Sequence, residues 1–271
     1  MIDWRLNLRG VRGRAYPRMI GALREPSWIF FETFLPLLGI AAFIFYYRSM
    51  GAPEVFTGFV VLGGAMTAFW LSVLWSMAMQ FYWEKETGNL QLLLLAPVSR
   101  MSVLAGMALG SVFSTSVRAT STFVLGVVIF GVTVSVASIW GLVAVFLVTL
   151  IALYGMGMMF ASLYMLYGRG AYNITSLAQE PIYLVSGFYF PVKALGFWVA
   201  AAAAIIPITF GLDAMRQLMF SGASVDPFFG WQVELVVLAL LAVLFIVLAR
   251  YSLRYMEELG KKEGRLTLRW Q

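Results

Sequence analysis

The sequence contains neither cysteine nor histidine. The absence of cysteine excludes disulfides, thiolate nucleophiles and cysteine-bound zinc, and the absence of histidine excludes histidine-based catalytic triads and histidine-ligated haem. The phosphate-binding loop G-x-x-x-x-G-K-[ST] does not occur either, so this chain is not expected to hold a nucleotide phosphate. We therefore predict no catalytic residue, metal site or cofactor in this chain, and we exclude a self-contained ATP-driven pump.

Charge is also scarce. Asp, Glu, Lys and Arg make up 12% of the 271 residues, against roughly 25% in soluble domains. Hydrophobic residues make up 61%, and the mean hydropathy is +0.86. A single water-facing domain of this length cannot bury so much apolar surface. The composition therefore predicts an all-α integral membrane protein with one transmembrane domain.

Six segments have the ~20 mostly apolar residues that a membrane-spanning helix requires. They are Trp28–Tyr47, Gly58–Gln80, Met107–Val132, Ile139–Leu166, Ile174–Phe190 and Val233–Ala249. A seventh apolar stretch, Ala194–Phe210, is interrupted by Gly196 and Pro207. This interruption predicts a re-entrant or short broken helix within an outer hairpin over residues 191–216. If the stretch crossed the membrane completely, the C-terminus would lie on the other side.

The basic residues indicate how the chain is oriented. With six spans, fifteen of the 19 Lys and Arg residues lie on one side of the membrane, while the other side holds three, Arg48, Lys193 and Arg216. Basic residues concentrate in cytoplasmic loops. We therefore predict six transmembrane helices with both termini in the cytoplasm. A seven-span topology is rejected because it would place the six C-terminal basic residues outside.

The N-terminal segment, residues 1–25, combines six arginines with spaced apolar side chains such as Trp4, Leu8 and Tyr16. This pattern predicts a helix in the cytoplasmic membrane interface, with its arginines on anionic headgroups. The alternative is a disordered basic tail that only sets the orientation. We accordingly divide the chain into this interfacial helix, a transmembrane domain over residues 26–252 and a basic cytoplasmic tail over residues 253–271.

The segment between the second and third spans, residues 83–100, has an unusual pattern. It begins with alternating charges at Glu84, Lys85 and Glu86, turns at Gly88, continues through a leucine-rich helix and stops at Pro97. It is too short to span a membrane and too apolar for a free loop. Its leucines are expected to be buried against a partner protein or the membrane interface. A re-entrant loop packed on its own bundle is the structural alternative.

The pattern Glu84-x-Glu86-x-Gly88-x-Leu90-x-x-Leu93-x-x-x-Pro97-Val98-Ser99-Arg100 resembles the cytoplasmic coupling segment of type-2 ATP-binding-cassette exporter permeases. These are the six-span subunits of bacterial drug, polysaccharide and lipid exporters. A second stretch, running from Pro181 through Ser186–Pro191 and Pro207–Thr209 to Arg216, is similar to the family's fifth span and outer hairpin. The hairpin differs in one place, because it reads Leu-Gly-Phe-Trp at residues 195–198 where the family usually has Leu-Pro followed by Trp.

The resemblance implies that two permease subunits, identical or related, pair in the bacterial plasma membrane. Each would dock its coupling segment, a cytoplasmic coupling helix, onto a separate cytoplasmic ATPase that binds ATP and magnesium. Glu84 and Glu86 would face this ATPase, and the Leu90–Leu95 helix would be the buried contact. The residues that the resemblance assigns to coupling are Glu84, Glu86, Gly88, Leu90, Leu93, Pro97 and Arg100.

Three ionisable residues, Glu32, Arg118 and Glu180, lie within predicted spans. A charge at the bilayer centre costs ~2.5–3.5 kcal/mol, so each should have a protein or water partner. Arg118 and Glu180 can pair if their helices are adjacent, and Pro181 can kink the helix that carries Glu180. Such a pair either lines the translocation path or fixes the register of the helices. Glu32, near the cytoplasmic edge, is expected to meet Arg24 or headgroups.

Together these features favour the membrane subunit of an ATP-driven exporter that moves an amphiphilic or lipid-like substrate. The substrate would leave under the outer hairpin, marked by Gly187, Pro191, Pro207 and Arg216. The alternatives are an ATPase-independent secondary transporter or channel and a lipid-modifying intramembrane enzyme. The ionisable residues are scattered rather than clustered at the midplane, and no D-x-x-D pair occurs, which disfavours both. Membrane lipids are expected partners, and nucleic acids are not.

Overall fold

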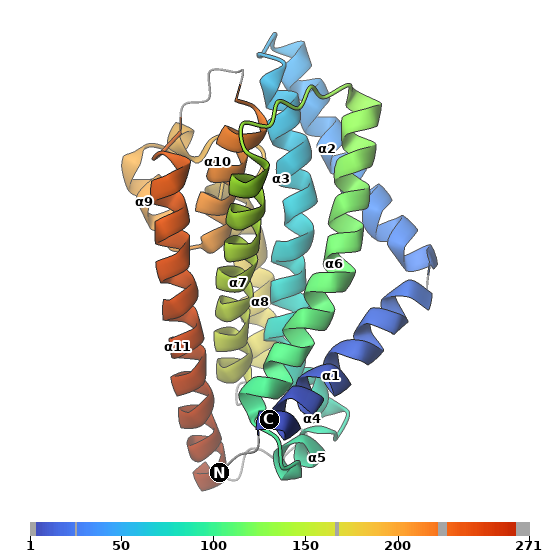
Figure 1. Ribbon diagram of the computed structural model, residues 1–271, viewed down its shortest axis with the longest axis vertical. Coiled ribbons are helices and arrows are strands. Elements are labelled where there is room, and N and C mark those ends of the chain that lie inside the picture. The colour runs from blue at the N-terminus through green and yellow to red at the C-terminus, as the bar shows by residue number, and fades with distance from the viewer. Residues whose placement is uncertain (1–3, 25, 166–167, 222–226, 264–271) are drawn as a thin grey trace.

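The computed structural model describes residues 4–24, 26–165, 168–221 and 227–263, and every named element in these ranges is a helix (Figure 1). The helices are α1 (Trp4–Arg24), α2 (Pro26–Ser49), α3 (Val55–Leu71), η1 (Ser72–Ala78), α4 (Gln80–Glu86), α5 (Leu90–Leu95), α6 (Arg100–Phe130), α7 (Ile139–Tyr164), α8 (Gly168–Val185), η2 (Val192–Leu195), α9 (Phe197–Ala203), α10 (Pro207–Met219) and α11 (Trp231–Glu263). The all-helical prediction is confirmed for this part of the chain.

Five helical segments are long and apolar enough to cross a membrane: α2, the continuous α3–η1 segment, α6, α7 and α11. A sixth is reached if α9 and α10 are counted together, although these two helices are bent by 109° at the break between them. This break lies within the predicted interrupted stretch Ala194–Phe210. The structure thus has five to six candidate spans, and its broken segment lies where Gly196 and Pro207 predicted one.

The fifth predicted span, Ile174–Phe190, is the one that matches no candidate spanning helix among the described residues. Helix α8 begins earlier, at Gly168, ends at Val185, and is not among the five long apolar helices. The chain leaves the helix because Gly187 adopts a φ of +70°, which ordinary L-residues avoid, and because Pro191 follows. Residues 186–190 therefore form a turn, although their apolar composition suggested that the helix continues.

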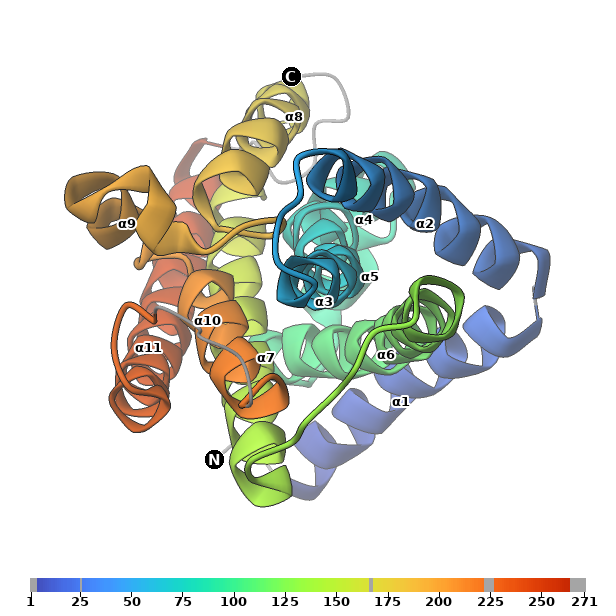
Figure 2. The same ribbon diagram turned by 90° about the horizontal axis from the view of Figure 1, so that it is seen from above.

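The centre of the molecule is α3. In the α3–η1 segment, 94% of the most apolar window is buried, and α2, α6, α7 and α10 pack around it (Figure 2). Phe69 and Trp70 on α3 are almost completely buried in the main core. Helix α11 packs along α7 and covers the other side of that helix. Helix α3 is thus the common packing surface for helices that come before and after it in the sequence.

Helix α3 continues into η1, a π-helix of seven residues. π-Helical turns are rare and often occur at functional sites, because the extra residue widens the helix and redirects side chains. Two polar contacts surround this turn: the Ser72 and Tyr154 hydroxyls lie 2.9 Å apart, and the Trp75 indole donates to Gln179 of α8 at 2.8 Å. Immediately after η1 the chain enters α4 and the coupling segment.

Helix α1 lies obliquely across the bundle and packs along the first half of α6 (Figure 1). Two glycines of α6, Gly106 and Gly110, permit this close approach. A Cβ atom on Gly106 would lie 2.5 Å from the Val11 carbonyl oxygen, and one on Gly110 would lie 3.0 Å from the Ala15 carbonyl oxygen. Small residues four apart are a common way to bring membrane helices together. Residues 4–24 thus form a helix; that this helix lies in the membrane interface stays a prediction.

The start of α1, the coupling segment and the end of α11 lie at one end of the bundle, which we call the α5 end, whereas α9 and α10 lie near the other (Figure 1). Helix α11 runs on to Glu263, so the first part of the predicted tail, residues 253–263, continues the last helix. Arg265 and Arg269 of that predicted tail lie outside the described residues.

Candidate functional site

The coupling segment folds as two short helices joined by a turn. Helix α4 ends at Glu86, Gly88 adopts a φ of +77°, and α5 spans Leu90–Leu95. Ala96 then takes an extended conformation before Pro97. The structure thus has a turn at Gly88 and a short helix after it. Arg100 is the first residue of α6, as its predicted place at the start of the third span requires.

The inner face of this segment packs on the chain itself. Leu90 is 1% exposed and belongs to the main hydrophobic core, and Leu93 packs against that core from a half-buried position. Glu84 is buried, accepts a hydrogen bond from Gln80 at 3.0 Å and pairs with Arg14 of α1 at 3.3 Å. The prediction that Glu84 faces outward is therefore wrong, because a partner 70 residues earlier in the chain draws it inward.

The outer face consists of different residues. Leu92 and Leu95 are 68% and 82% exposed, and Glu86 at the end of α4 is also exposed. Sequence reasoning overlooked these two leucines. Helical spacing could have separated them, because positions 90 and 93 share one face of a helix and positions 92 and 95 share another.

A buried polar cluster connects α1 to this segment. Arg18 of α1 donates to the Ser111 hydroxyl at 2.6 Å and also bonds the Gln80 side-chain oxygen. Burial lowers the pKa of Arg18, and the negative charge of Glu84 opposes that shift. At the other end of the segment, the Ser99 backbone N–H donates to the Asn7 side-chain oxygen at 2.9 Å. Helix α1 is thus bonded to the segment both before and after α5.

The last helix contacts the same segment. Arg100 pairs with Glu257 of α11 at 2.9 Å, and Lys261 approaches the same carboxylate at 2.5 Å. Glu257 is 9% exposed, so this ion pair is more shielded than a typical surface pair. The three helices α1, α6 and α11 therefore hold the two ends of the coupling segment in place.

The intramembrane charges pair differently from the expectation. Arg118 of α6 forms an ion pair with Glu32 of α2, and it donates to the Thr115 hydroxyl at 3.1 Å. Glu180 lies exposed on α8 and accepts from Gln179 at 2.9 Å. The condition for an Arg118–Glu180 pair, adjacent helices, is not met, because α6 packs on α2 and not closely on α8. Glu32 likewise meets Arg118 rather than Arg24. Pro181 lies inside α8.

Of the predicted outer-hairpin residues, the structure brings Arg216 and Gly187 into direct contact. The Arg216 side chain is 1% exposed, and its guanidinium donates to the carbonyl oxygens of Gly187 at 2.7 Å, Phe188 at 2.9 Å and Phe190 at 3.1 Å. It also lies over the Phe59 ring of α3, 5.0 Å from the centroid. The turn after α8 is thereby anchored against α3.

Close backbone contact completes this anchor. A Cβ atom on Gly63 of α3 would lie 1.5 Å from the Phe188 carbonyl oxygen, so only glycine fits there. Pro191 precedes the short helix η2, and Pro207 begins α10. Pro207 suits that position because the first residue of a helix needs no backbone donor. Sequence reasoning had not identified Gly63.

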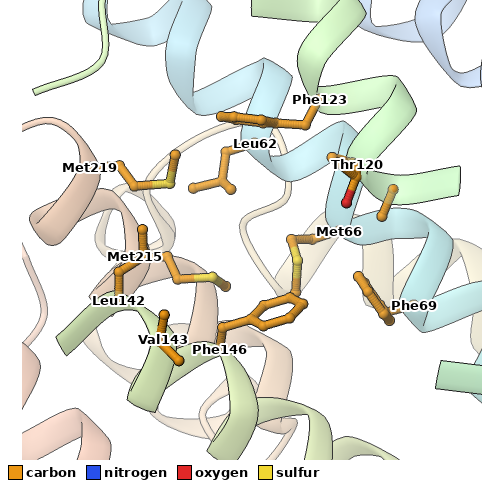
Figure 3. A pocket seen from close by; sticks show the side chains of 12 residues that line it. Leu62, Met66, Phe69, Thr120, Phe123, Leu142, Val143, Phe146, Met215 and Met219 are labelled. Carbon is orange, nitrogen blue, oxygen red and sulfur yellow. The ribbon is translucent and has the colours of Figure 1, made fainter. Parts of the chain in front are cut away.

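An apolar groove lies between α3, α6, α7 and α10 (Figure 3). Its volume is ≈ 250 Å³. Thr120 supplies the one side-chain hydroxyl among its 12 described lining residues. Figure 3 shows Met66, Met215 and Phe146 directed toward its centre. No group of three or more acidic residues that could hold a metal ion occurs in the part of the chain that the structure describes.

Comparison with known families identifies the family to which the chain belongs. Residues 18–220 match the model of the ABC-2 type transporter family. The chain belongs to this family. The match extends from α1 to the end of α10, so it includes the coupling segment, the Arg216 anchor and the groove of this ABC-2 type transporter. No curated protein matches the chain.

Membership of the ABC-2 type transporter family identifies the chain as a transmembrane permease of an ABC transporter. Its apolar helices make it a multi-pass membrane protein. Permeases of this family normally work with a cytoplasmic ABC ATPase, and ATP hydrolysis is typically not a property of the permease itself. The resemblance inferred from residues 83–100 and the outer hairpin is thus confirmed. The alternative of an ATPase-independent transporter or channel has no support.

Proposed function

We propose that this permease is the membrane subunit of an ATP-driven exporter and that residues 83–100 couple it to a separate ATPase. The division of α5 into two faces carries the proposal. Leu90 is fixed in the core, whereas Leu92 and Leu95 are 68% and 82% exposed at a helix that lies at the end of the bundle. Exposed apolar residues one turn apart suit a contact in which a helix inserts into a groove of a partner.

The supports of the coupling segment explain how movement would pass inward. Glu84 is held by Arg14, and Arg100 is held by Glu257. A displacement of α5 by the ATPase therefore acts on α1, α6 and α11 together, and through α4 on the π-helix η1. In this proposal Glu86, which is exposed, takes the outward role that Glu84 does not fill. Gly88 supplies the turn, and Pro97 ends the segment.

We further propose six crossings, with both termini in the cytoplasm of a bacterium and residues 1–25 lying in the inner-leaflet interface of its plasma membrane. In this topology α8 is the fifth crossing, and α9 and α10 form a re-entrant hairpin. The 109° bend between these two helices supports a hairpin that returns to its own side. The positions of the start of α1 and the end of α11, both at the α5 end, support an even number of crossings.

The second permease subunit is inferred from the face of α8. This helix presents Asn173, Ser176 and Glu180 outward, together with Leu177 and Leu184. Polar groups at membrane depth should face protein or water, not lipid. A second subunit placed along α8 would cover this surface or enclose a path beside it. The mixture of polar and apolar side chains suits an amphiphilic or lipid-like substrate, leaving outward under the hairpin anchored by Arg216, while ATP and magnesium bind the ATPase.

The proposal is tested by placing one charge on the outer face of α5. In Leu92→Asp and Leu95→Asp, the permease should insert and fold but lose the ATPase on mild-detergent purification, with at least a tenfold drop in the recovered ATPase-to-permease ratio. Tyr255→Asp is the matched control, because Tyr255 is 61% exposed on α11 and belongs to no part of the coupling segment. Undiminished ATPase recovery and export in both leucine variants would contradict the proposal.

A further inference from the structure

The apolar groove lies on the side of α3 opposite α8. Helices α6 and α7 diverge toward the α9 end, and α3 forms the floor between them (Figures 1 and 2). Met215 and Met219 close the groove from α10. Because α8 lies on the other side of α3, the groove is separate from the surface that we assign to the second subunit.

The lining of the groove suits hydrocarbon and little else. Leu62, Met66, Phe123 and Phe146 form its walls, and Thr120 contributes the one hydroxyl among the described lining residues. Apolar cavities of ~150 Å³ stay dry and accept small hydrocarbons. The volume of this groove is ≈ 250 Å³. Methionine side chains are flexible and polarisable, so they can adapt to a chain of variable shape.

The mouth of the groove opens toward the membrane. The neighbouring outward residues are Val124 and Val128 on α6, which are 50% and 73% exposed, and Val143 and Leu147 on α7, which are 42% and 51% exposed. All four lie in helices that are apolar enough to span the bilayer. The medium in contact with the mouth is therefore lipid hydrocarbon.

Hydrogen bonds at the ends of α6 and α7 hold the walls of the groove apart. The segment between α6 and α7 is bonded to the end of α10: the Ser135 N–H donates to the Met219 carbonyl at 2.9 Å, and the Ala137 N–H donates to the Leu218 carbonyl at 2.8 Å. On the other side, Arg48 of α2 donates to the Phe130 carbonyl at the end of α6 at 2.9 Å. These contacts fix the tops of α6 and α7 to different neighbours, so the space between the two helices is built into the fold.

We infer that this groove is a lipid-binding site that takes one acyl chain of a bilayer phospholipid per permease subunit. The occupant comes from the membrane, because the mouth meets hydrocarbon and the lining offers no charged partner among the described residues. An empty groove would lose the dispersion contacts of its lining atoms, and a bound acyl chain restores them. The site is distinct from the coupling segment and from the α8 surface.

One test fills the groove. Thr120→Trp and Val143→Trp place an indole at its rim, whereas Ile151→Trp, two turns further along the outward face of α7 and 51% exposed, serves as the matched control. The transporter is purified from phosphatidylethanolamine and phosphatidylglycerol bilayers and examined by native mass spectrometry. We expect one retained phospholipid fewer per subunit in the two groove variants and an unchanged number in the control. Equal lipid retention in all three variants and the wild type would overturn the inference.

A second test uses the unchanged protein. Phosphatidylethanolamine with a diazirine at the middle of one acyl chain is photolysed in the bilayer at increasing mole fractions. Labelling at the groove methionines should saturate at low mole fraction, while labelling at Leu35 and Leu38, exposed on α2, should rise in proportion. Proportional labelling at both places would show ordinary surface lipid and overturn the site. Loss of the groove label during ATP turnover alone would assign it to transported substrate and overturn the inference equally.

Discussion

At the scale of single residues, the ion pair between Arg118 and Glu32 shows how charge is accommodated within the spans. The Arg118 side chain is 13% exposed and the Glu32 side chain is 36% exposed, so the pair is partly shielded on the boundary between α2 and α6. Each charge supplies the partner that the other needs at membrane depth. The pair joins two helices that would otherwise meet through apolar contacts, and it therefore fixes their register.

This pairing predicts that removing one charge destabilises the permease, whereas exchanging the two charges restores part of the lost stability. Glu32→Gln or Arg118→Gln should destabilise the permease by about 1.5–3 kcal/mol, the value of a hydrogen bond to a charged group. The exchange Glu32→Arg with Arg118→Glu should recover at least half of that loss, because the opposite charges still meet. Thermal unfolding of the purified permease measures the three variants. If the double exchange loses as much stability as Glu32→Gln and Arg118→Gln lose together, the two residues do not form a direct pair.

At the scale of secondary structure, the contact between α1 and α6 depends on two glycines. Gly106 and Gly110 leave room for the α1 backbone, and the polar bonds of Arg18 follow from that closeness. The helix that lies along the membrane interface in our proposal is thus fixed to the element that follows the coupling segment.

Gly110→Leu should therefore displace α1. The leucine would meet the Ala15 backbone and the Arg18 side chain, an overpacking that costs about 1–3 kcal/mol. We expect faster hydrogen–deuterium exchange across α1 and a loss of ATP-driven transport, with the remaining helices unaffected. Gly13→Leu is the control, because no atom lies within 4 Å of a Cβ at that position. Equal exchange in both variants would show that α1 does not depend on this contact.

At the scale of the whole molecule, much of one face of α8 is left uncovered by the described part of the chain. Helix α8 contacts chiefly η1 and α9, and its outward face bears Asn173, Ser176 and Glu180. This face of α8 is therefore left exposed by the fold, and we expect it to be buried in a symmetric pair of permeases.

The absence of cysteine allows a direct measurement of that pair. Single-cysteine variants Ser176→Cys and Leu177→Cys, treated in membranes with a short bismaleimide, should give a cross-linked permease dimer. Val243→Cys on α11, which is 63% exposed on another side, should remain monomeric under the same treatment. Cross-linking at Val243→Cys without any at the two α8 positions would place the subunit interface elsewhere.

Much of this architecture could be predicted from hydropathy, since a long apolar run is itself the requirement for a spanning helix. The predicted start of the fourth span at Ile139 coincides with the start of α7, and the structure has a short helix at residues 90–95, where the leucine-rich pattern lies. The end of α8 could not be predicted, because the turn at residues 186–190 is as apolar as a span. Arg216 and Gly63, distant in sequence, hold it in place.

The orientation of side chains could not be predicted from the sequence either. The family resemblance implied that Glu84 faces the ATPase, yet Arg14 turns it inward. The partner of Arg118 could not be assigned, since sequence depth alone places Glu180 within reach and says nothing of which helices are neighbours. Leu92 and Leu95 became recognisable as the outer face once the burial of Leu90 was known.

The Arg216 anchor also constrains how the sequence can vary. Its guanidinium binds backbone carbonyls of residues 187, 188 and 190, and every amino acid supplies a carbonyl. The side chains of Tyr189 and Phe190 can therefore be exchanged without removing these hydrogen bonds. Arg216 and Gly63 have no such freedom, since one provides all the donors and the other the space. The attachment of the outer hairpin thus has two positions that must be kept, Arg216 and Gly63, beside side chains whose exchange leaves the anchor in place.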